Sequence, residues 1–326
     1  MNSLLARFAE NGFWMARYME RAENLARILD VNESFARDSD GEQDWLPIVQ
    51  LHADDEAFFR RHAEATADAV IEFYILDREN PNSVVQTIWA ARENARTLRH
   101  LISIELWSQL NVFYGSVSAL RPRDLSLAQL SRLCQSIKEG CQLHTGIVEG
   151  TTFRDQSWLF YQLGKIIDRA DQTTRLLDIK YHRLLPHVAD VGTSIDVSQW
   201  NALLRSVAGY HGYRRVRPSG MSPESVAEFI LLNAAFPRSV ACCVERIRYY
   251  LDLIASNPDL AGVAFAADGL VDLEMQMSMS MKEVIGEGLH EYLDRAQINL
   301  QRLTNAIDRT FFNAQPAAPT SQSQYQ

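Results

Sequence analysis

Hydrophobic residues recur every three or four positions along most of the chain. Phe8, Met15, Ala22 and Leu29 lie seven residues apart, and this spacing places them on one face of a helix expected over about residues 4–37. No stretch shows the sustained alternation of hydrophobic and polar residues that is typical of a half-buried strand. The pattern therefore predicts an all-α protein.

Prolines divide the remainder of the chain into further helices. Pro81, with polar N-cap candidates directly after it, predicts one long helix that reaches about residue 113. A second break at Pro122 precedes another long helix. The second half has the same plan and ends in a helix expected over about residues 270–312, which gives about ten helices in all.

One segment near the N-terminus returns in the second half of the chain. In residues 20–30 and 168–178, acid aligns with acid and amide with amide, and Arg21 and Arg27 recur as arginines. Two later segments return in the same order. They are marked by Trp45 with Trp200 and by Glu72 with Glu228. Three collinear matches predict a tandem duplication of a unit of about 150 residues.

The duplication sets the expected domain boundaries. We expect a first helical repeat over residues 1–150 and a second repeat, packed on the first, over residues 151–312. The two halves should be related by approximate twofold symmetry. Residues 313–326 are rich in Pro, Ala, Ser, Thr and Gln, and this composition predicts a disordered tail.

The composition narrows the function classes. Of the 326 residues, 47% are hydrophobic and 22% are charged, and no stretch approaches the ~20 apolar residues of a membrane-spanning helix. The net charge of −9 argues against a general nucleic-acid binder, which carries a basic face. Four cysteines without a C-x-x-C pair predict free thiols in a reducing compartment. Cytoplasm is the simplest location.

The duplicated segment carries the first candidate chemistry. Glu20, Glu23 and Arg27 cluster on the side of the first helix opposite its apolar stripe. Glu23 and Arg27 form an i,i+4 pair, which Asp171 and Arg175 repeat. A buried structural network between the halves accounts best for charge types that are kept in both copies. A functional acidic–basic cleft and a plain solvated face remain alternatives.

Two further groups could bind an anion. Arg92 and Arg96 lie four residues apart on either side of Glu93, so they could grip a carboxylate or phosphate from one helix face. Alternatively, they neutralise the carboxylates of the first helix. Arg238 follows Pro237 at an expected helix start, where an anion site or an ordinary cap would fit.

Standard catalytic signatures do not appear. The chain has no Walker sequence and no G-x-S-x-G elbow, and Glu287-x-x-His290 has no partner motif for a di-iron site. We therefore expect neither a metal nor a cofactor.

The opening residues resemble the signature of a known family. Residues 9–24 are similar to the signature of the bacterial alpha-E family, an all-helical family named for its characteristic glutamates. Further blocks match in order, so the resemblance covers the chain from residue 1 to about 312. They are residues 91–96, 158–178, 200–215 and 236–240. Lys165 and Ile166 stand where the family often has Arg and Tyr.

The resemblance implies a pathway and two partners. Members of the alpha-E family are typically encoded beside, or fused to, a circularly permuted ATP-grasp protein and a transglutaminase-like peptidase. This similarity implies a component of an ATP-grasp-linked peptide or amide ligation or modification pathway, which handles a peptide-like or carboxylate substrate. The alternative is a non-catalytic helical scaffold or adaptor for the ATP-grasp enzyme.

The first of these two functions assigns roles to eight residues. The candidate catalytic acid/base groups are Glu20, Glu23 and Glu93. The candidate substrate-binding groups are Arg21, Arg27, Arg92, Arg96 and Arg238. In the second function, the same charges stabilise the interior of the protein.

Overall fold

The computed structural model describes residues 3–38, 44–184, 194–218, 220–257 and 269–312. Within these residues the chain forms fifteen α-helices, numbered α1 to α15, and no strand. The all-α class is confirmed, whereas the expected number of about ten helices is too low. The expected disordered tail at residues 313–326 lies outside the described residues.

Short helices and extra breaks account for the higher helix number. The long helix expected after Pro81 is two helices, α5 (Val84–Thr97) and α6 (Ile104–Ser118), because Ser103 caps the second by accepting from the backbone N–H of Leu106. The helix expected over residues 270–312 is likewise divided. Its parts are α13 (Leu270–Met277), α14 (Met281–Glu287), α15 (Leu289–Ile307) and a π-helical turn, η4 (Asp308–Phe312).

The first half consists of α1 to α7 and contains two long helices. α1 (Ser3–Asp38) is the longest helix in the described residues, and α7 (Leu127–Thr151) closes the half after a short 3-10 turn, η1 (Pro122–Asp124). Three short helices lie between α1 and α5. They are α2 (Leu46–Leu51), α3 (Asp55–Phe59) and α4 (Ala67–Ile75).

The second half begins with α8 (Gln156–Leu184) and continues through three shorter helices to α12 (Val240–Ala255). The shorter helices are α9 (Ser194–Ser206), α10 (Tyr210–Val216) and α11 (Pro223–Leu232). Ser239 caps α12 in the way that Ser83 caps α5, since each hydroxyl accepts from the backbone N–H three residues on. This likeness agrees with the duplication, which stays a prediction until the halves are superposed.

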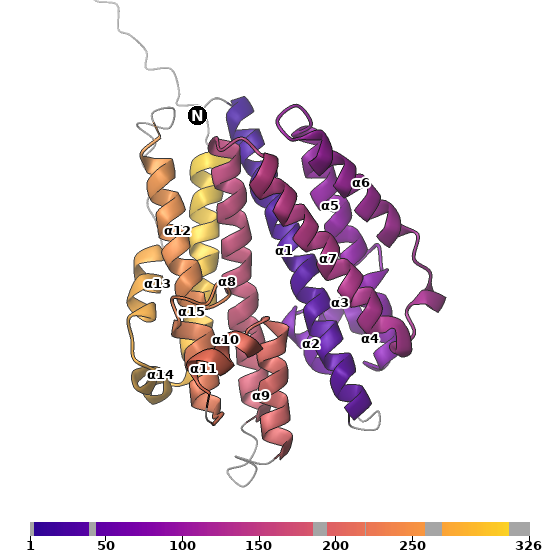
Figure 1. Cartoon of the computed structure of the whole chain (residues 1–326), viewed down its shortest axis with the longest axis vertical. Helices are drawn as coiled ribbons and strands as arrows, with labels where there is room; N and C mark the ends of the chain where they lie inside the picture. Colours follow the sequence, from indigo (N-terminus) through magenta and orange to yellow (C-terminus); the bar gives the residue numbers. More distant parts are fainter. Residues whose placement is uncertain (1–2, 39–43, 185–193, 219, 258–268, 313–326) are drawn as a thin grey trace, which may run out of the picture.

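The two long helices α1 and α8 lie side by side at the centre of the molecule (Figure 1). α5 and α7 pack against α1 on one side, and α12 and α15 pack against α8 on the other. The interior is filled by hydrophobic residues from both halves, including Phe13, Leu25 and Leu29 of α1 and Phe160 and Leu177 of α8. The α1–α8 pair is therefore the axis around which the helices are arranged.

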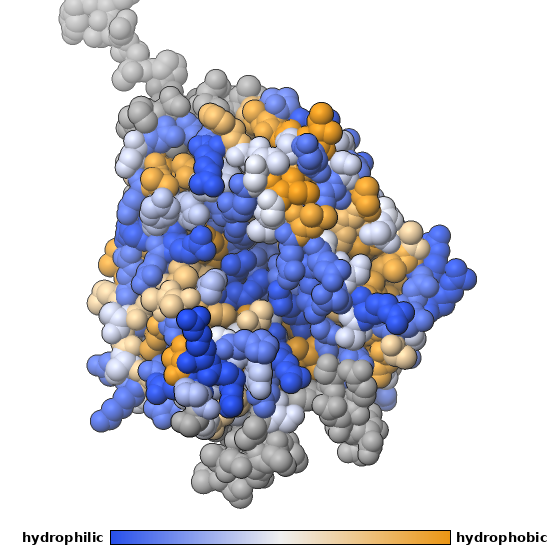
Figure 2. All heavy atoms as spheres, viewed as in Figure 1, coloured by the Kyte–Doolittle hydropathy of each residue, from blue (hydrophilic) through white to orange (hydrophobic). Residues whose placement is uncertain are grey.

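The surface combines polar and apolar regions. Figure 2 shows hydrophilic side chains over the middle of the molecule, and hydrophobic side chains near the upper ends of α6 and α7. Ile104 and Phe153 are strongly exposed, and a hydrogen bond between Ser103 and Thr151 holds these two helix ends together. None of the helices in the described residues is both long and apolar enough to cross a bilayer.

Candidate functional site

Two glycines allow α1 and α8 to approach closely. A Cβ on Gly164 would overlap the backbone carbonyl oxygen of Phe13, and a Cβ on Gly12 would lie 3.0 Å from the carbonyl oxygen of Ser157. Any larger residue at position 164 would push the helices apart, because the obstructing atom belongs to the backbone. The close approach places the polar face of each helix within reach of the other.

The acid–arginine pairs that recur in the two halves are exchanged between α1 and α8. Arg169 of α8 donates from Nε and Nη2 to the two carboxylate oxygens of Glu20 on α1, at 2.9 and 2.7 Å. In the opposite direction, Arg21 of α1 donates from Nε to Oδ1 of Asp168 on α8, at 2.9 Å. Each helix thus supplies the acid for one pair and the arginine for the other. Such a reciprocal contact is typical of a twofold arrangement.

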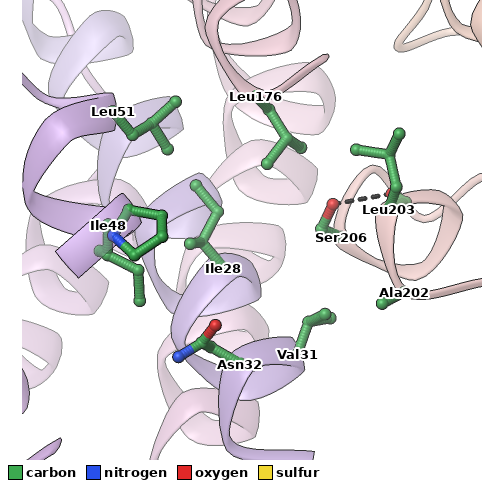
Figure 3. Close-up of a pocket in the computed structure, with 10 residues that line it drawn as sticks. Ile28, Val31, Asn32, Ile48, Leu51, Leu176, Ala202, Leu203 and Ser206 are labelled. Carbon is green, nitrogen blue, oxygen red and sulfur yellow. Dashed lines mark hydrogen bonds between the residues drawn. The ribbon is translucent and has the colours of Figure 1, made fainter. Parts of the chain in front are cut away.

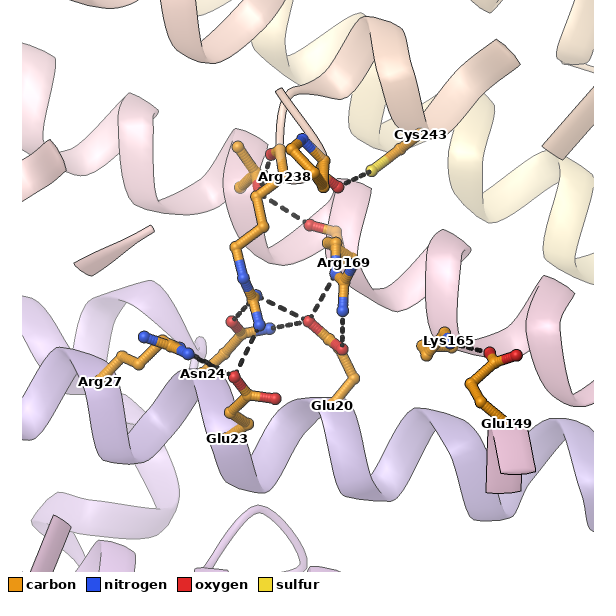
Figure 4. A network of polar contacts seen from close by, with 11 residues as sticks. Glu20, Glu23, Asn24, Arg27, Glu149, Lys165, Arg169, Arg238 and Cys243 are labelled. Carbon is orange, nitrogen blue, oxygen red and sulfur yellow. Dashed lines mark hydrogen bonds and ion pairs between the residues drawn. The ribbon is translucent and has the colours of Figure 1, made fainter. Parts of the chain in front are cut away.

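Arg238 joins the first pair from a third direction (Figure 4). It lies between α11 and α12, and its Nη1 donates to Glu20 Oε1 and Asn24 Oδ1, both at 2.8 Å. Its Nη2 donates to Glu23 Oε1 at 2.8 Å. Thr173 of α8 holds the backbone carbonyl of Arg238 at 3.2 Å. One side chain therefore connects the start of α12 to three residues of α1.

The i,i+4 pairs lie at the edges of this network. Arg27 donates from Nε to the same Glu23 oxygen that accepts from Arg238, at 3.0 Å. The equivalent pair on α8, Arg175 with Asp171, is formed at 2.8 Å but is more exposed. The arginine side chains retain 13% and 35% of their exposure, respectively.

Asp168 has a different environment from Glu20. Its Oδ1 accepts from Arg21 and also from Nε of Arg17, at 3.1 Å. Its Oδ2 is buried and has no hydrogen-bond partner. Arg17 also reaches Thr304 of α15 and lies over the rings of Phe13 and Trp14. This acid is therefore held by two arginines from one helix, at only one of its oxygens.

The two acids have opposite pKa shifts. Burial alone would raise the pKa of Glu20, but the charges of Arg169 and Arg238 outweigh it and hold this pKa well below its usual range. Burial raises the pKa of Asp168, and the opposing charges of Arg21 and Arg17 do not compensate fully. Glu20 therefore stays ionised far into the acid range, whereas Asp168 takes up a proton more readily than an ordinary aspartate.

Five of the eight predicted site residues meet in this region. They are Glu20, Glu23, Arg21, Arg27 and Arg238. Glu20, Glu23 and Arg238 are buried, which agrees with the interpretation as a buried network between the halves. The catalytic or substrate-binding roles of these residues stay predictions, because the geometry does not test them.

The other three predicted residues form a separate cluster on α5. Arg92 donates to Glu93 and to Asn111 of α6, both at 2.8 Å, and Arg96 pairs with Glu93 at 2.7 Å. These arginines therefore do not neutralise the carboxylates of α1, which was the alternative expected from the sequence. The guanidinium of Arg92 lies over the ring of Trp107, 5.4 Å from its centroid. Arg92 and Glu93 are half-buried, and Arg96 is exposed.

Three further residues belong to the site and were not among the predicted ones: Asp168, Arg169 and Arg17. The first two carried a signal, because they are the second copy of Glu20 and Arg21. Their importance was hidden because a duplicated motif does not show which copy of an acid faces which copy of an arginine. Only the close approach of α1 and α8 decides that the pairs are exchanged.

An apolar pocket lies beyond the end of this network (Figure 3). Its walls come from α1, α2, α8 and α9. The hydrophobic lining residues include Ile28, Leu51, Leu176 and Leu203. No ionisable side chain lines this pocket, so it lacks the convergent charged groups that orient a substrate.

The cysteines and the metal-ligating residues add little chemistry. All four cysteines are free thiols, as predicted, and burial raises the pKa of Cys243 to about 12. A buried thiol with a raised pKa is a poor nucleophile. In the part of the chain that the structure describes, no group of three or more His, Cys, Asp or Glu residues could hold a metal ion.

Comparison with known proteins identifies a family and distant relatives. A family model named Alpha-E, described as a predicted alpha-helical domain with a conserved ER motif, matches residues 4–312. The chain is similar over 303 residues to the uncharacterized protein Mb2597 of Mycobacterium bovis, at 26% identity, and to the uncharacterized protein Rv2567 of Mycobacterium tuberculosis, at 25% identity. Each match covers 86% of this chain and 34% of the relative, so the chain spans about a third of the length of these relatives. No solved structure matches the chain significantly.

Proposed function

Because this chain belongs to the Alpha-E family, we propose that it acts as a non-catalytic helical partner in an ATP-grasp-linked peptide or amide ligation pathway. Its partners in this proposal are a circularly permuted ATP-grasp protein and a transglutaminase-like protein. The buried acid–arginine network stabilises one fixed arrangement of the two halves, and an exposed face recognises the partner.

The proposal rests on the observation that the carboxylates of Glu20 and Glu23 are both paired with arginines and buried. Each acid accepts hydrogen bonds from two arginines, and each is about 95% buried. A general base works best when its pKa lies near the working pH, whereas the pKa of Glu20 is held far below it. These properties favour a structural role for the pair over proton transfer.

The ER motif of the family can be placed by burial. Glu-Arg occurs twice in the chain, at residues 20–21 and 245–246. Glu245 and Arg246 are exposed, whereas Glu20 is buried and Arg21 is partly buried in the exchanged pairs. We infer that Glu20-Arg21 is the ER motif and that its role is to join α1 to α8.

The Arg92 cluster is the face that we assign to partner recognition. Arg96 and Arg99 are exposed beside Arg92, and Glu93 is the carboxylate that pairs with Arg92 and Arg96. Arg92 and Arg99 both lie over the ring of Trp107, which holds them in place through cation–π contacts. Ordered arginines on one helix face are suited to an acidic surface or a carboxylate terminus.

The length of the relatives is consistent with a partner role. In each mycobacterial relative the matched segment is one third of a longer chain, so further polypeptide is covalently joined to it. A helical module that works beside another protein would fit either arrangement, fused or separate. The identity of the additional segments is part of the proposal.

Co-purification with the neighbouring ATP-grasp protein tests the proposal. We expect a stable complex that Arg92→Ala weakens about tenfold or more, because an ordered charged contact at an interface is worth over ~1 kcal/mol. Arg123→Ala is the control, since this arginine is 86% exposed and belongs to η1 rather than to α5. ATP turnover by the complex should be insensitive to Glu23→Gln. Loss of turnover in a folded Glu23→Gln complex would show that Glu23 takes part in the reaction.

A substrate-handling role remains the second candidate, and Glu93 favours it. Its carboxylate is 25% exposed between two arginines, so unlike Glu20 it can be reached from solvent. In this case Glu93→Gln should reduce turnover while the complex and the fold persist. In the partner role, Glu93→Gln should change binding alone.

A further inference from the structure

Lys165 differs from the residue that occupies the equivalent position on the other central helix. It lies 148 residues after Arg17, the offset that also relates Glu20 to Asp168. Arg17 donates to Asp168, and an exchanged arrangement would direct Lys165 to Glu20. Glu20, however, already accepts from Arg169 and Arg238, so Lys165 lies at the edge of the pair as an additional cation.

The contacts of Lys165 do not satisfy its ammonium group. Its Nζ reaches Oε1 of Glu149 on α7 at 3.4 Å, a long hydrogen bond. The same Glu149 oxygen accepts a shorter bond from Nε2 of Gln162, at 2.7 Å. An ammonium has three donors, and Lys165 is only 8% exposed, so water cannot replace the missing acceptors freely. Its remaining contact in the described residues is the ring of Tyr161, 5.8 Å away.

Other polar groups beside Lys165 also lack partners. Both ring nitrogens of His144 on α7 are buried without a hydrogen bond, and so is Oε1 of Gln162. Burial and, to a smaller extent, the nearby charge of Lys165 lower the pKa of His144 to about 3. His144 is therefore neutral and offers one N–H donor and one acceptor nitrogen. So many unpaired polar atoms between two helices call for an explanation.

We propose that Nζ of Lys165, the ring N–H of His144 and Nε2 of Gln162 form a binding site for a carboxylate, which displaces Glu149 from Lys165. Glu149 can leave readily because its side chain is 41% exposed and its bond to Lys165 is long. Figure 4 shows Lys165 and Glu149 directed toward each other beside the Glu20 network. The incoming carboxylate takes the place of Glu149 as the acceptor for the ammonium. This site goes beyond the proposed function and does not depend on the partner face on α5.

The charges favour a carboxylate over a phosphate. Arg169 and Arg238 keep their acceptors on Glu20 and Glu23, so the departure of Glu149 removes one negative charge, and removes it from Lys165 alone. A carboxylate balances one charge. A phosphate dianion would bring a second, unpaired charge into a largely buried site, which is costly.

Protection of Lys165 from an amine-reactive reagent tests the site. The chain has four lysines, so labelling of each can be followed by mass spectrometry. We expect sodium acetate to slow labelling of Lys165, compared with sodium chloride at equal ionic strength, and to leave the exposed Lys282 unaffected. Sodium phosphate is the second probe and should protect Lys165 less than acetate.

Removing the carboxylate of Glu149, which competes with acetate for Lys165, makes the test more stringent. In Glu149→Gln, the acetate concentration for half-protection should fall about threefold, because the carboxylate of Glu149 no longer competes for the ammonium group of Lys165. Glu139→Gln, an exposed change on the same helix, should leave it unchanged. Lys165→Met should abolish the shift of the His144 ring signal that acetate produces in NMR spectra. Absence of protection in both the wild type and Glu149→Gln, equal protection of Lys282, or protection by phosphate alone would overturn the proposal.

Discussion

Glu20 and Asp168 occupy matching positions on the two central helices, but their hydrogen-bond environments differ. Glu20 is held at both oxygens by arginines from the second half, Arg169 and Arg238. Asp168 is held at one oxygen by Arg17 and Arg21 of α1, and its other oxygen has no partner. The same acid–arginine exchange therefore leads to a lowered pKa on one side and a raised pKa on the other.

The difference between the environments of Glu20 and Asp168 originates at the residue that follows a proline in each half. Pro237 is followed by Arg238, whose guanidinium reaches Glu20, Glu23 and Asn24. In the first half the corresponding residue after Pro81 is Asn82, whose amide instead donates to Asp54 at 3.0 Å. One difference in an otherwise similar connection decides which acid receives an arginine from the helix start that follows the proline. Two similar segments thus meet in a shared interface, and single residues make its two sides unequal.

Removal of Arg238 should have the largest effect. We expect Arg238→Ala to lower the free energy of unfolding by about 3–5 kcal/mol, because it leaves two buried carboxylates without one of their donors. Asn82→Ala, its counterpart, should cost only about 1 kcal/mol, as a partly buried amide hydrogen bond does. Urea unfolding of both variants measures the contrast. Equal losses would show that the two sides of the interface are equivalent after all.

Substituting Glu20 and substituting Asp168 by their neutral amides should change the pH dependence of stability in different ways. Glu20 has a lowered pKa, so its contribution to stability is complete above the ordinary value of ~4.3 and is lost as pH falls through the lowered pKa. Glu20→Gln should therefore cost about 3 kcal/mol at neutral pH and should reduce the loss of stability in acid.

Asp168 should behave in the opposite sense. Its raised pKa favours the protonated form, so its contribution is complete below the ordinary value of ~3.9 and is lost as pH rises through the raised pKa. Asp168→Asn should cost less than Glu20→Gln at neutral pH, about 1–2 kcal/mol. The difference between this variant and the wild type should grow as pH falls toward 4. Unfolding free energies measured from pH 3 to 8 test both variants, and identical pH profiles would contradict the assigned shifts.

The two i,i+4 pairs, Arg27 with Glu23 and Arg175 with Asp171, should show the smallest difference in their contributions to stability. Arg27→Ala removes a donor from the buried Glu23, so we expect a clear fall in the unfolding midpoint, of about 1–2 kcal/mol in free energy. Arg175→Ala breaks a pair that is about one third exposed and should cost only a few tenths of a kcal/mol. Thermal unfolding of the two variants under the same conditions provides the measurement. An unchanged midpoint in Arg27→Ala would indicate that its pair is solvated.

Helix periodicity was enough to predict the fold class but not the helix boundaries. The stripe from Phe8 to Leu29 is buried or partly buried as expected, because a long helix repeats its pattern many times. Short helices such as α2 and α3 contain too few turns to show a period. The break between α5 and α6 was missed because Ser103 acts as a cap only when the chain around it turns.

The candidate site could be predicted only in part. The charges of Glu20, Glu23 and Arg27 identified one face of α1 as unusual, since both copies of the motif retain them. The partner of each charge could not be read from the chain, because Arg169 and Arg238 are 149 and 218 residues away from Glu20. Arg92 and Arg96 both pair with Glu93, so the alternative that they neutralise the carboxylates of α1 was wrong, whereas their predicted anion-binding role stays a prediction.

By itself, the sequence determined that the protein is helical and which charged residues stand out, since both follow from local spacing along a helix. The tertiary structure alone decided that the acids and arginines are exchanged between α1 and α8. It also decided that Arg238 closes one side and that Lys165 has a single, long hydrogen bond in the described residues. The physical reason is that an ion pair depends on the distance between two side chains. Here that distance is set by the close approach of two helices at Gly12 and Gly164, which no local pattern encodes.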